Sequence, residues 1–233
     1  MAARKKVNTT KKEIIQVAMR MFLENGFSNT SVKSISDELE ISTGNLTFHY
    51  PTKEHLLAVL VRLLCDFQWD TMEHVKGEGA SSLLALCLEL PMMAAMCDEN
   101  AVTKDFYMSA YTLPMTLNII RVSDMAKAKS VFAEFCPGWT NEHFAEAEVL
   151  ASGIEYATLM TTELSPALEV RVAGALNTIL GIYWVPEAQR KEVVSKVMEK
   201  DYRSIGRRLL AEFHDYVCSL SEEKLERLLL QKK

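Results

Sequence analysis

Apolar residues recur every three or four positions along most of this chain, which is the spacing that places them on one face of an α-helix. The clearest case covers Lys11 to Asn25. Its apolar stripe consists of Ile14, Ile15, Ala18, Met21 and Phe22. Gly26 then suits the left-handed backbone position that follows many helices. No stretch alternates convincingly between apolar and polar residues, so the pattern predicts an all-α fold.

Three short helices are predicted within residues 11–49, and a tight turn separates the second from the third. Thr30 can cap the second helix and Ser42 the third, because a hydroxyl accepts hydrogen bonds from the first free amides of a helix. The third helix should run to about His49, and the turn before it covers Leu39 to Ser42. Two helices joined in this way form a helix-turn-helix. A fourth helix should start just after Pro51.

The remaining sequence predicts further helices. The segments are Ser81 or Ser82 to Cys97, 104–121, 124–135, 141–164, 166–184, 186–220 and a short helix from Ser221. Pro91 and Pro114 should kink two of them, because proline removes a backbone donor. Residues 76–79 predict a flexible joint. We therefore expect a helix-turn-helix domain (1–55), a larger helical domain (56–220) and a terminal helix or tail (221–233).

Charge is spread unevenly along the 233 residues, although the total is only −5. Residues 1–55 hold eight basic and six acidic residues, so about +2, and the remainder holds 18 basic against 25 acidic residues, so −7. Five of the basic residues lie within the first twelve positions. A polyanion would be attracted to this end and repelled from the rest, although a solvated terminus has the same composition.

The cysteines are odd in number and widely spaced. They are Cys65, Cys87, Cys97, Cys136 and Cys218. This pattern predicts reduced, mostly buried thiols in a cytoplasm. No signal peptide is predicted, because the first twelve residues are polar with no apolar run behind them. The most apolar stretch, Ala80 to Cys97, contains two serines, a glutamate and a proline, so no membrane association is expected.

The predicted third helix has two different faces. The outward positions are Thr43, Asn45, Thr47 and His49, and the inward positions are Leu46 and Tyr50. A small polar outer face is what a helix needs to enter the major groove of duplex DNA. Gly44 has no side chain, so the first turn can bring its backbone close to a phosphate.

Several landmarks within residues 11–58 stand at the spacing of a known domain without a gap. They are Phe22-Leu23-Glu24-Asn25-Gly26-Phe27, Thr30-Ser31-Val32, Ile35-Ser36, Ile41-Ser42-Thr43-Gly44-Asn45-Leu46, His49-Tyr50 and Lys53-Glu54-His55-Leu56-Leu57. This run resembles the DNA-binding domain of the TetR/AcrR family of transcriptional regulators. The resemblance covers about a quarter of the chain, and the rest is similar to the family only in length and helical character.

The resemblance implies which residues contact double-stranded operator DNA. They are Thr30, Ser31 and Lys33 at the start of the second helix, Thr43, Gly44, Asn45, Thr47, Phe48 and His49 in the third, and Lys53 at the start of the fourth. The family usually has a tyrosine at the position of Thr47, and a threonine reaches less far toward a phosphate. Simpler roles stay open, since Thr30 is also an ordinary cap and Phe48 could pack in a core.

The resemblance also implies that residues 56–220 regulate, bind a ligand and dimerise. Gly174 and Gly181 lie seven apart on one helical face, where small residues allow close helix approach. Apolar residues continue at helical spacing through 186–220. The predicted homodimer interface consists of Gly174, Gly181, Val194, Met198, Ile205 and Leu209. Packing of both helices inside one monomer is the alternative.

Methionines and aromatic residues near the predicted kinks suit an adaptable pocket for a largely apolar small molecule. The candidates are Met92, Met96, Tyr107, Tyr111, Met115, Tyr156 and Met160, any of which could instead be ordinary core. Glu89 and Glu155 could meet a cationic ligand. However, Glu155 lies seven residues from Glu148 and from Thr162, a spacing that fits a solvated face better.

Together these features predict a repressor that binds a palindromic operator as a homodimer and is released by an unidentified small-molecule effector. No enzyme is expected, because the sequence has no phosphate loop, no Gly-x-Ser-x-Gly elbow, no paired histidines and no Cys-x-x-Cys. No cofactor and no metal site are predicted. A helical interaction protein that has lost its DNA contact is the alternative.

Overall fold

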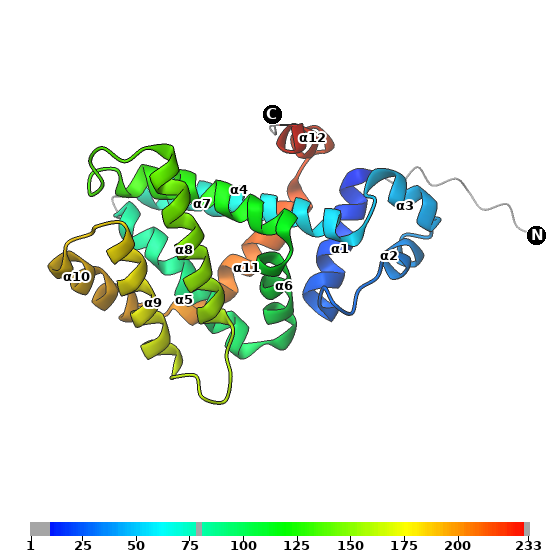
Figure 1. Ribbon diagram of the computed structural model, residues 1–233. Helices are drawn as coiled ribbons and strands as arrows, with labels where there is room; N and C mark the ends of the chain where they lie inside the picture. Colours follow the sequence, from blue (N-terminus) through cyan, green and yellow to red (C-terminus); the bar gives the residue numbers. More distant parts are fainter. Residues whose placement is uncertain (1–9, 78–80, 231–233) are drawn as a thin grey trace, which may run out of the picture.

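The computed structural model describes residues 10–77 and 81–230, and each regular element in this part of the chain is an α-helix (Figure 1). The helices are α1 (Lys11–Asn25), α2 (Val32–Glu38), α3 (Thr43–His49), α4 (Lys53–Gly77), α5 (Ser82–Glu99), α6 (Ala101–Thr112), α7 (Pro114–Phe132), α8 (Asn141–Leu159), α9 (Leu168–Ile182), α10 (Glu187–Met198), α11 (Tyr202–Ser219) and α12 (Glu222–Leu230). The predicted all-α fold is confirmed. Arg4, Lys5, Lys6 and part of the predicted joint at 76–79 lie outside the described residues.

Side-chain caps determine where the short N-terminal helices begin. The side chain of Thr10 starts α1 with a capping box. Ser31 caps α2 by accepting a hydrogen bond from the amide of Ser34 at 3.0 Å. Thr30, which we expected to be this cap, is buried instead, and its hydroxyl donates to the carbonyl oxygen of Gly26 at 2.8 Å. The predicted cap was therefore wrong by one residue.

The helices α1 to α3 enclose a small apolar core. Its residues are Ile14, Ile15, Ala18, Met19, Phe22, Ile35, Leu46 and Tyr50. Met19 takes the place that the pattern assigned to Met21, which is only partly buried. Each large apolar side chain contributes roughly 1.5–3 kcal/mol when it is buried. A unit of this size is stable only with support from neighbouring structure.

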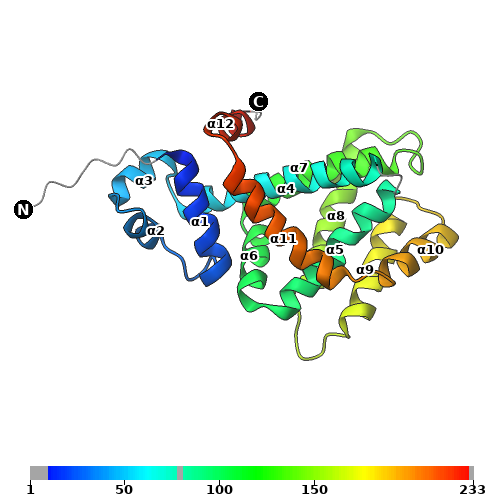
Figure 2. The same ribbon diagram turned by 180° about the vertical axis from the view of Figure 1, so that it is seen from behind.

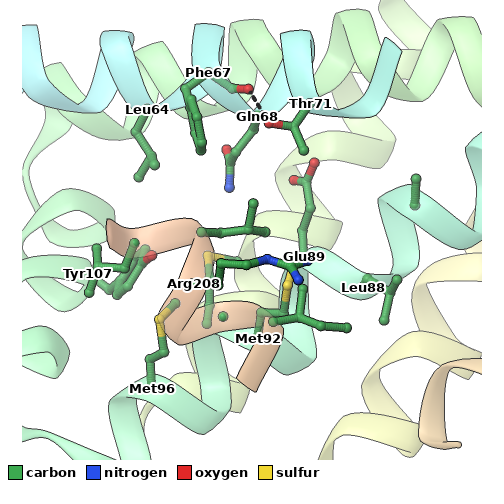
Figure 3. A pocket seen from close by; sticks show the side chains of 16 residues that line it. Leu64, Phe67, Gln68, Thr71, Leu88, Glu89, Met92, Met96, Tyr107 and Arg208 are labelled. Carbon is green, nitrogen blue, oxygen red and sulfur yellow. Dashed lines mark hydrogen bonds between the residues drawn. The ribbon is translucent and has the colours of Figure 1, made fainter. Parts of the chain in front are cut away.

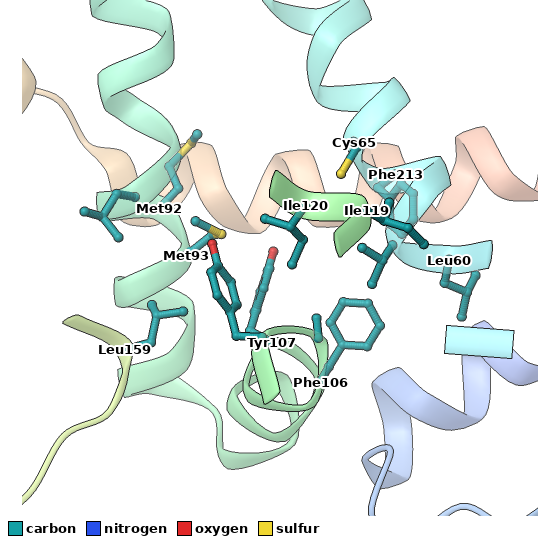
Figure 4. Packing of buried hydrophobic residues seen from close by; sticks show 14 of the residues in the cluster. Leu60, Cys65, Met92, Met93, Phe106, Tyr107, Ile119, Ile120, Leu159 and Phe213 are labelled. Carbon is teal, nitrogen blue, oxygen red and sulfur yellow. The ribbon is translucent and has the colours of Figure 1, made fainter. Parts of the chain in front are cut away.

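A larger core surrounds α5, which contacts α4, α6, α9, α10 and α11. Its second half, Leu90 to Cys97, is buried on all sides. Figure 4 shows Met93 of α5, Tyr107 of α6 and Ile120 of α7 meeting in this core. Pro114 is the first residue of α7 rather than a kink inside a helix, because a missing N–H costs nothing at that position.

One predicted long helix is two helices in the structure. The segment 186–220 contains α10 and α11, which are separated by residues 199–201. The side chain of Asp201 accepts a hydrogen bond from the amide of Ser204 at 3.1 Å, and this cap restarts the helix. The apolar spacing continues across the break, so the pattern alone did not reveal it. The prediction of one continuous helix was wrong.

Besides α4, the N-terminal helices are joined to the rest of the molecule through α6 and through α11 and α12. Asp105 of α6 accepts hydrogen bonds from the amide of Ser28, at 2.8 Å, and from its hydroxyl. On another side α12 contacts α1, where the Lys11 ammonium lies 3.0 Å from Oε1 of Glu226. Both views show α12 above the junction between α1 and α4 (Figures 1 and 2). The predicted divisions at 55 and 220 stay a prediction, and α4 crosses the first without interruption.

Helix length and hydropathy bear on membrane insertion. Among the helices of residues 10–77 and 81–230, none combines the length and the apolar character that crossing a bilayer requires.

Gly26 is required both by its backbone conformation and by its neighbour. Its φ is +90°, and a Cβ at this position would lie 2.8 Å from Oδ2 of Asp105. Gly138 has a similar φ of +84°, but a Cβ added there would meet no atom within 4 Å, so it isolates the conformational effect. We expect Gly138→Ala to lower the free energy of unfolding by about 1 kcal/mol and Gly26→Ala by about 2–3 kcal/mol, measured by urea unfolding.

The difference between the two substitutions should depend on Asp105. In an Asp105→Ala background the cost of Gly26→Ala should fall to that of Gly138→Ala, because the clash disappears. An unchanged cost in that background would contradict this account of the α1–α6 contact.

Candidate functional site

The third helix has the two faces that the sequence predicts. Leu46 is fully buried and Tyr50 nearly so, whereas Thr43, Gly44 and Asn45 are exposed. Ser42 begins α3 by accepting a hydrogen bond from the amide of Asn45 at 3.1 Å. The helix is therefore anchored by one apolar side and offers a small polar side to the surroundings.

Phe48 is the most unusual residue on this outer face. Its side chain is 85% exposed, so it is not the core residue that the sequence left as an alternative. Its ring lies edge-on to His49, with 5.3 Å between the ring centroids. A large exposed aromatic group is costly to leave in water, and such groups often mark binding surfaces.

Two of the outer hydroxyls are engaged within the domain. The Thr47 hydroxyl donates to the carbonyl oxygen of Thr43 at 3.0 Å. The hydroxyls of Thr43 and Ser36 lie 3.2 Å apart, which links α3 to α2. Thr47 and His49 are half-buried. Thr43 is thus both exposed and held in place, whereas the Thr47 hydroxyl is turned back onto its own helix.

The remaining predicted contact residues differ in their availability. Ser31 and Lys33 are exposed at the start of α2, where Lys33 forms an ion pair with Asp37. Thr30 is only 2% exposed. The Lys53 ammonium donates to the carbonyl oxygens of Phe27, at 2.9 Å, and Thr30, at 3.1 Å. Thr30 and Lys53 therefore hold the 26–30 loop against α4 in this structure.

A cavity of about 150 Å³ lies between α4, α5 and α11 (Figure 3). Its wall is largely apolar, and the predicted residues Met92, Met96 and Tyr107 are part of it. Figure 3 shows the polar side chains of Gln68, Thr71, Glu89 and Arg208 around this space. An apolar wall with a few polar groups is typical of a ligand pocket, and ligand binding at this cavity stays a prediction.

The other predicted pocket residues lie elsewhere. Tyr111 lines a smaller cavity of about 40 Å³ between α4, α6 and α7. Met115 and Met160 are exposed, and Tyr156 is half-buried outside the three cavities described in residues 10–77 and 81–230. In contrast, α11 contributes residues to the main cavity that the sequence assigned to an interface. These residues are Ile205 and Leu209, beside Gly206 and Leu210.

Gly206 explains why α11 lies close enough to α5 to form one wall of this cavity. A Cβ at Gly206 would be 3.3 Å from Cβ of Met92 and 3.4 Å from its carbonyl oxygen. A side chain at this position would push Met92 away by a few tenths of an ångström, so glycine favours the close approach.

A buried charged cluster lies behind the cavity. Lys127 is fully buried, and its ammonium is 2.9 Å from Oε2 of Glu89 and 3.2 Å from Oδ1 of Asp124. Burial alone would lower the pKa of Lys127, but the charges of Glu89 and Asp124 raise it above its usual value. Lys127 therefore stays charged, and it ties α5 to α7.

Two further glutamates of α8 belong to the same cluster, so the prediction of a solvated face for them was wrong. Burial, reinforced by the charge of Asp124, raises the pKa of Glu148 to about 9 and that of Glu155 to about 8. The Tyr111 hydroxyl donates to Oε2 of Glu155 at 2.9 Å. The Tyr183 hydroxyl donates to Oε2 of Glu148 at 3.4 Å.

The cysteines follow the prediction for a reduced protein. All five are free thiols, and four of them are buried, with Cys218 exposed. Burial raises the pKa of Cys65, Cys87 and Cys97 to about 12, so these thiols are unreactive.

The outer surfaces of α8 and α9 form an exposed face with apolar and small residues. On α8 these residues are Val149, Leu150, Gly153 and Ala157, and on α9 they are Val170 and Gly174. Gly174 is open to the surroundings, but Gly181 faces the guanidinium of Arg190. The four predicted interface residues of α10 and α11 pack against the subunit's own core. They are Val194, Met198, Ile205 and Leu209.

The N-terminal helices that carry the two-faced α3 match a known family. Residues 14–60 match the family model described as "Bacterial regulatory proteins, tetR family". This match identifies residues 14–60 as a TetR-family N-terminal domain. The remaining helices of the chain lie outside the matched residues.

Relatives of known name agree with this assignment. The chain is 25% identical over 120 residues to the uncharacterized HTH-type transcriptional regulator YuxN of Bacillus subtilis, a match that covers 52% of this chain and 41% of that protein. It is 34% identical over 77 residues to the HTH-type transcriptional repressor KstR2 of Mycobacterium tuberculosis, covering 33% and 38% respectively. The matches thus span about two fifths of the length of these relatives.

Solved structures are also similar. CprB of Streptomyces coelicolor, described as a TetR family protein, has a TM-score of 0.45 at 18% identity, with 80% of this chain and 95% of that chain covered. KstR2 of Mycobacterium tuberculosis, described as a ketosteroid transcriptional regulator, has a TM-score of 0.40 at 18% identity, with 92% and 98% covered. Scores this low add nothing to the description of the C-terminal helices.

Sequence reasoning missed two features of the site. The Glu89–Lys127 pair joins residues 38 apart, and no local pattern connects them. The face of α8 and α9 did leave a signal, since Val149-Leu150, Gly153 and Ala157 share one helical side, which is the spacing of a packed helix.

Replacing Lys127 should test the buried cluster. Lys127→Met keeps the apolar stem and removes the ammonium, which leaves the partly buried carboxylates of Glu89 and Asp124 without their cation. We expect a loss of about 3–5 kcal/mol in the free energy of unfolding, measured by urea unfolding. Lys129→Met, an exposed position on the same helix, should change it by less than about 0.5 kcal/mol.

The loss should be partly reversible by a second change. Adding Glu89→Gln to Lys127→Met removes one of the two unpaired carboxylates, and some stability should return. If the double variant is no more stable than Lys127→Met, the ion pair does not have the assigned role.

Proposed function

We propose that this chain is a transcriptional regulator that binds a palindromic duplex operator as a homodimer and represses transcription until a small molecule releases it. The observation that carries the proposal is the form of α3, a seven-residue helix with a buried Leu46 and an exposed polar face. The named relatives, described as HTH-type transcriptional regulators or repressors, support it. The expected location of such a regulator is the cytoplasm.

The outer face of α3 supports reading of base edges in the major groove. The carboxamide of Asn45 can form two hydrogen bonds with an adenine, and the exposed ring of Phe48 can contact a thymine methyl group. Thr43 and His49 add polar groups, and Gly44 lets the backbone approach a phosphate.

Phosphate contacts are assigned to the start of α2. Ser31 and Lys33 are exposed there, beside the free amides of the first helical turn. Thr30 and Lys53 are assigned an indirect role in DNA binding, because their polar groups already form hydrogen bonds with the 26–30 loop. The Thr47 hydroxyl is likewise engaged with its own helix.

Dimerisation is assigned to the exposed face of α8 and α9, in place of the predicted pairing of α9 with 186–220. Two such helices from each subunit form a four-helix interface around a two-fold axis. Val149, Leu150 and Val170 supply apolar area, and Gly153 and Gly174 allow close approach. The two copies of α3 would then lie about 34–36 Å apart, one turn of B-DNA.

Effector response is assigned to the apolar cavity between α4, α5 and α11. Tyr107 lines it two residues after Asp105, the α6 residue that bonds the N-terminal domain. The helix α11 also lines it and leads into α12, which contacts α1. A ligand that favours another placement of α6 or α11 would move α1. To change the ratio of DNA-binding to released conformation from 99:1 to 1:99, the ligand must bind the released conformation about 10⁴-fold more tightly.

DNA recognition is testable with single substitutions. With genomic fragments retained by the purified protein as probes, Asn45→Ala and Thr43→Ala should change sequence preference at a cost of about 1–3 kcal/mol. Phe48→Ala should weaken specific binding without loss of thermal stability, because the ring makes little contact within the subunit. The measurement is fluorescence anisotropy together with thermal unfolding.

A pair of lysines provides the control for non-specific attraction. Lys33→Ala should weaken binding to all duplexes. It should also reduce the slope of log binding constant against log salt concentration by about one. Lys129→Ala, at another exposed lysine far along the chain, should not. Lys53→Ala should lower both stability and DNA affinity. If every variant binds like wild type, the alternative of a helical interaction protein without DNA contact is favoured.

The dimer interface can be tested independently of DNA. Gly174→Arg places a long cation on the proposed face at a position that has room for it in one subunit, so the chain should fold and remain monomeric. Ala188→Arg, on the exposed side of α10, should leave the dimer intact. Light scattering after gel filtration gives the mass, and a dimeric Gly174→Arg would exclude this face.

A further inference from the structure

Three acidic side chains of the buried cluster lie close together, although no sequence motif indicates a site there. Asp124 belongs to α7, and Glu148 and Glu155 lie two turns apart on α8. One carboxylate oxygen from each lies within 4.8 Å of the other two. Oxygen atoms that share one ion at about 2.4 Å are separated by no more than twice that distance, so the three are close enough to share a cation.

Glu148 has an atom that the protein leaves without a partner. Its side chain is 4% exposed, and its Oε1 has neither a hydrogen-bond partner nor contact with solvent. The other oxygen, Oε2, receives the Tyr183 hydroxyl. A buried acceptor without a partner costs about 1–3 kcal/mol or more when it is charged, and such an atom calls for a missing ligand. Glu148 also lines a cavity of about 50 Å³ together with Asp124 and Glu155.

Other groups of the protein accommodate this cluster without a metal ion only if Glu148 and Glu155 are protonated, in line with their raised pKa values. The cluster contains four carboxylates and the ammonium of Lys127, which lies between Glu89 and Asp124. With all groups ionised, four negative charges against one positive charge leave −3. The Tyr111 hydroxyl occupies one oxygen of Glu155 but adds no charge. Buried charges require compensation by an opposite charge or a metal ion.

We propose that Asp124, Glu148 and Glu155 bind one divalent metal ion per subunit. The three donors are carboxylate oxygens, which suit hard ions such as Mg²⁺, Mn²⁺ or Ca²⁺ rather than the softer Zn²⁺. The ion joins α7 to α8 behind the cavity at Glu89. This differs from the prediction that the chain has no metal site, because that prediction relied on local spacing and these ligands lie on two helices. The site does not depend on the DNA-binding proposal.

The test uses the full chain after treatment with a chelator and its removal. Calorimetric titration with Mn²⁺, Mg²⁺ and Ca²⁺ should give one site per chain for at least one of them, and with Zn²⁺ weaker binding. At a concentration about 100 times Kd, the ion should raise Tm by about 5–10 °C. No binding heat and no rise in Tm with any of the three ions at about 1 mM would overturn the proposal.

Substitutions locate the ion. Glu148→Gln and Glu155→Gln keep the shape and remove one charge, so each should weaken binding by more than about 10-fold. Without metal, both variants should be at least as stable as wild type, since each removes an uncompensated carboxylate. Glu146→Gln, an exposed glutamate on α8, is the matched control and should bind like wild type.

The variants distinguish a ligand role from general charge. Equal binding by wild type, Glu148→Gln and Glu155→Gln would place the ion elsewhere and overturn the assignment. If either variant fails to fold, Asp124→Asn takes its place with the same expected loss of binding. DNA binding by the metal-loaded and metal-free chain is measured separately, so failure of one proposal leaves the other standing.

Discussion

One rigid helix, α6, serves both halves of the molecule, and the proposed regulation depends on this constraint. Asp105 bonds the Ser28 region of the N-terminal domain, and Tyr107 lines the main cavity two residues later. A helix rises only about 1.5 Å per residue and does not bend within a turn. A displacement of the α6 backbone at Tyr107 therefore displaces Asp105 as well. The N-terminal core is small enough to need this attachment, which makes its position responsive to the larger core.

The second attachment, through α12, makes the same connection from the other side. The helix α11 packs closely against α5 at Gly206, forms one wall of the cavity and is followed by α12. There Glu222 and Glu226 meet Lys11 at the start of α1. The exposed ion pair is worth little in free energy by itself. Its contribution is to fix the position of α1 relative to α11, with Leu225 buried at the contact.

The interior behind the cavity contains an unusual amount of charge for a helical core. Lys127 is compensated by Glu89 and Asp124, but the two glutamates of α8 are not, and burial raises the pKa of both. Apolar side chains could fill this volume at less cost. Keeping four carboxylates here is understandable if the cluster binds something positive, and two of them belong to α8, the helix whose outer face we assign to the dimer.

The sequence by itself determined the helical fold, the helix-turn-helix and the outward face of α3. These depend on residues three or four positions apart, and the landmarks of residues 11–58 carry that information in one continuous stretch. The apolar character of the pocket was also predictable, since Met92 and Met96 lie four residues apart on one predicted helix.

Only the tertiary structure decided which residues meet across helices. It engaged the polar groups of Thr30 and Lys53 in the contact between the 26–30 loop and α4. It placed Ile205 and Leu209 at the wall of the cavity. It also brought the carboxylates of Asp124, Glu148 and Glu155 together. Periodicity states which side of a helix is apolar but not what covers that side. A cap, as at Asp201, can also end one helix and begin another without changing the apolar spacing. Contacts between distant segments depend on the packing of all helices at once, and a single sequence does not specify that packing locally.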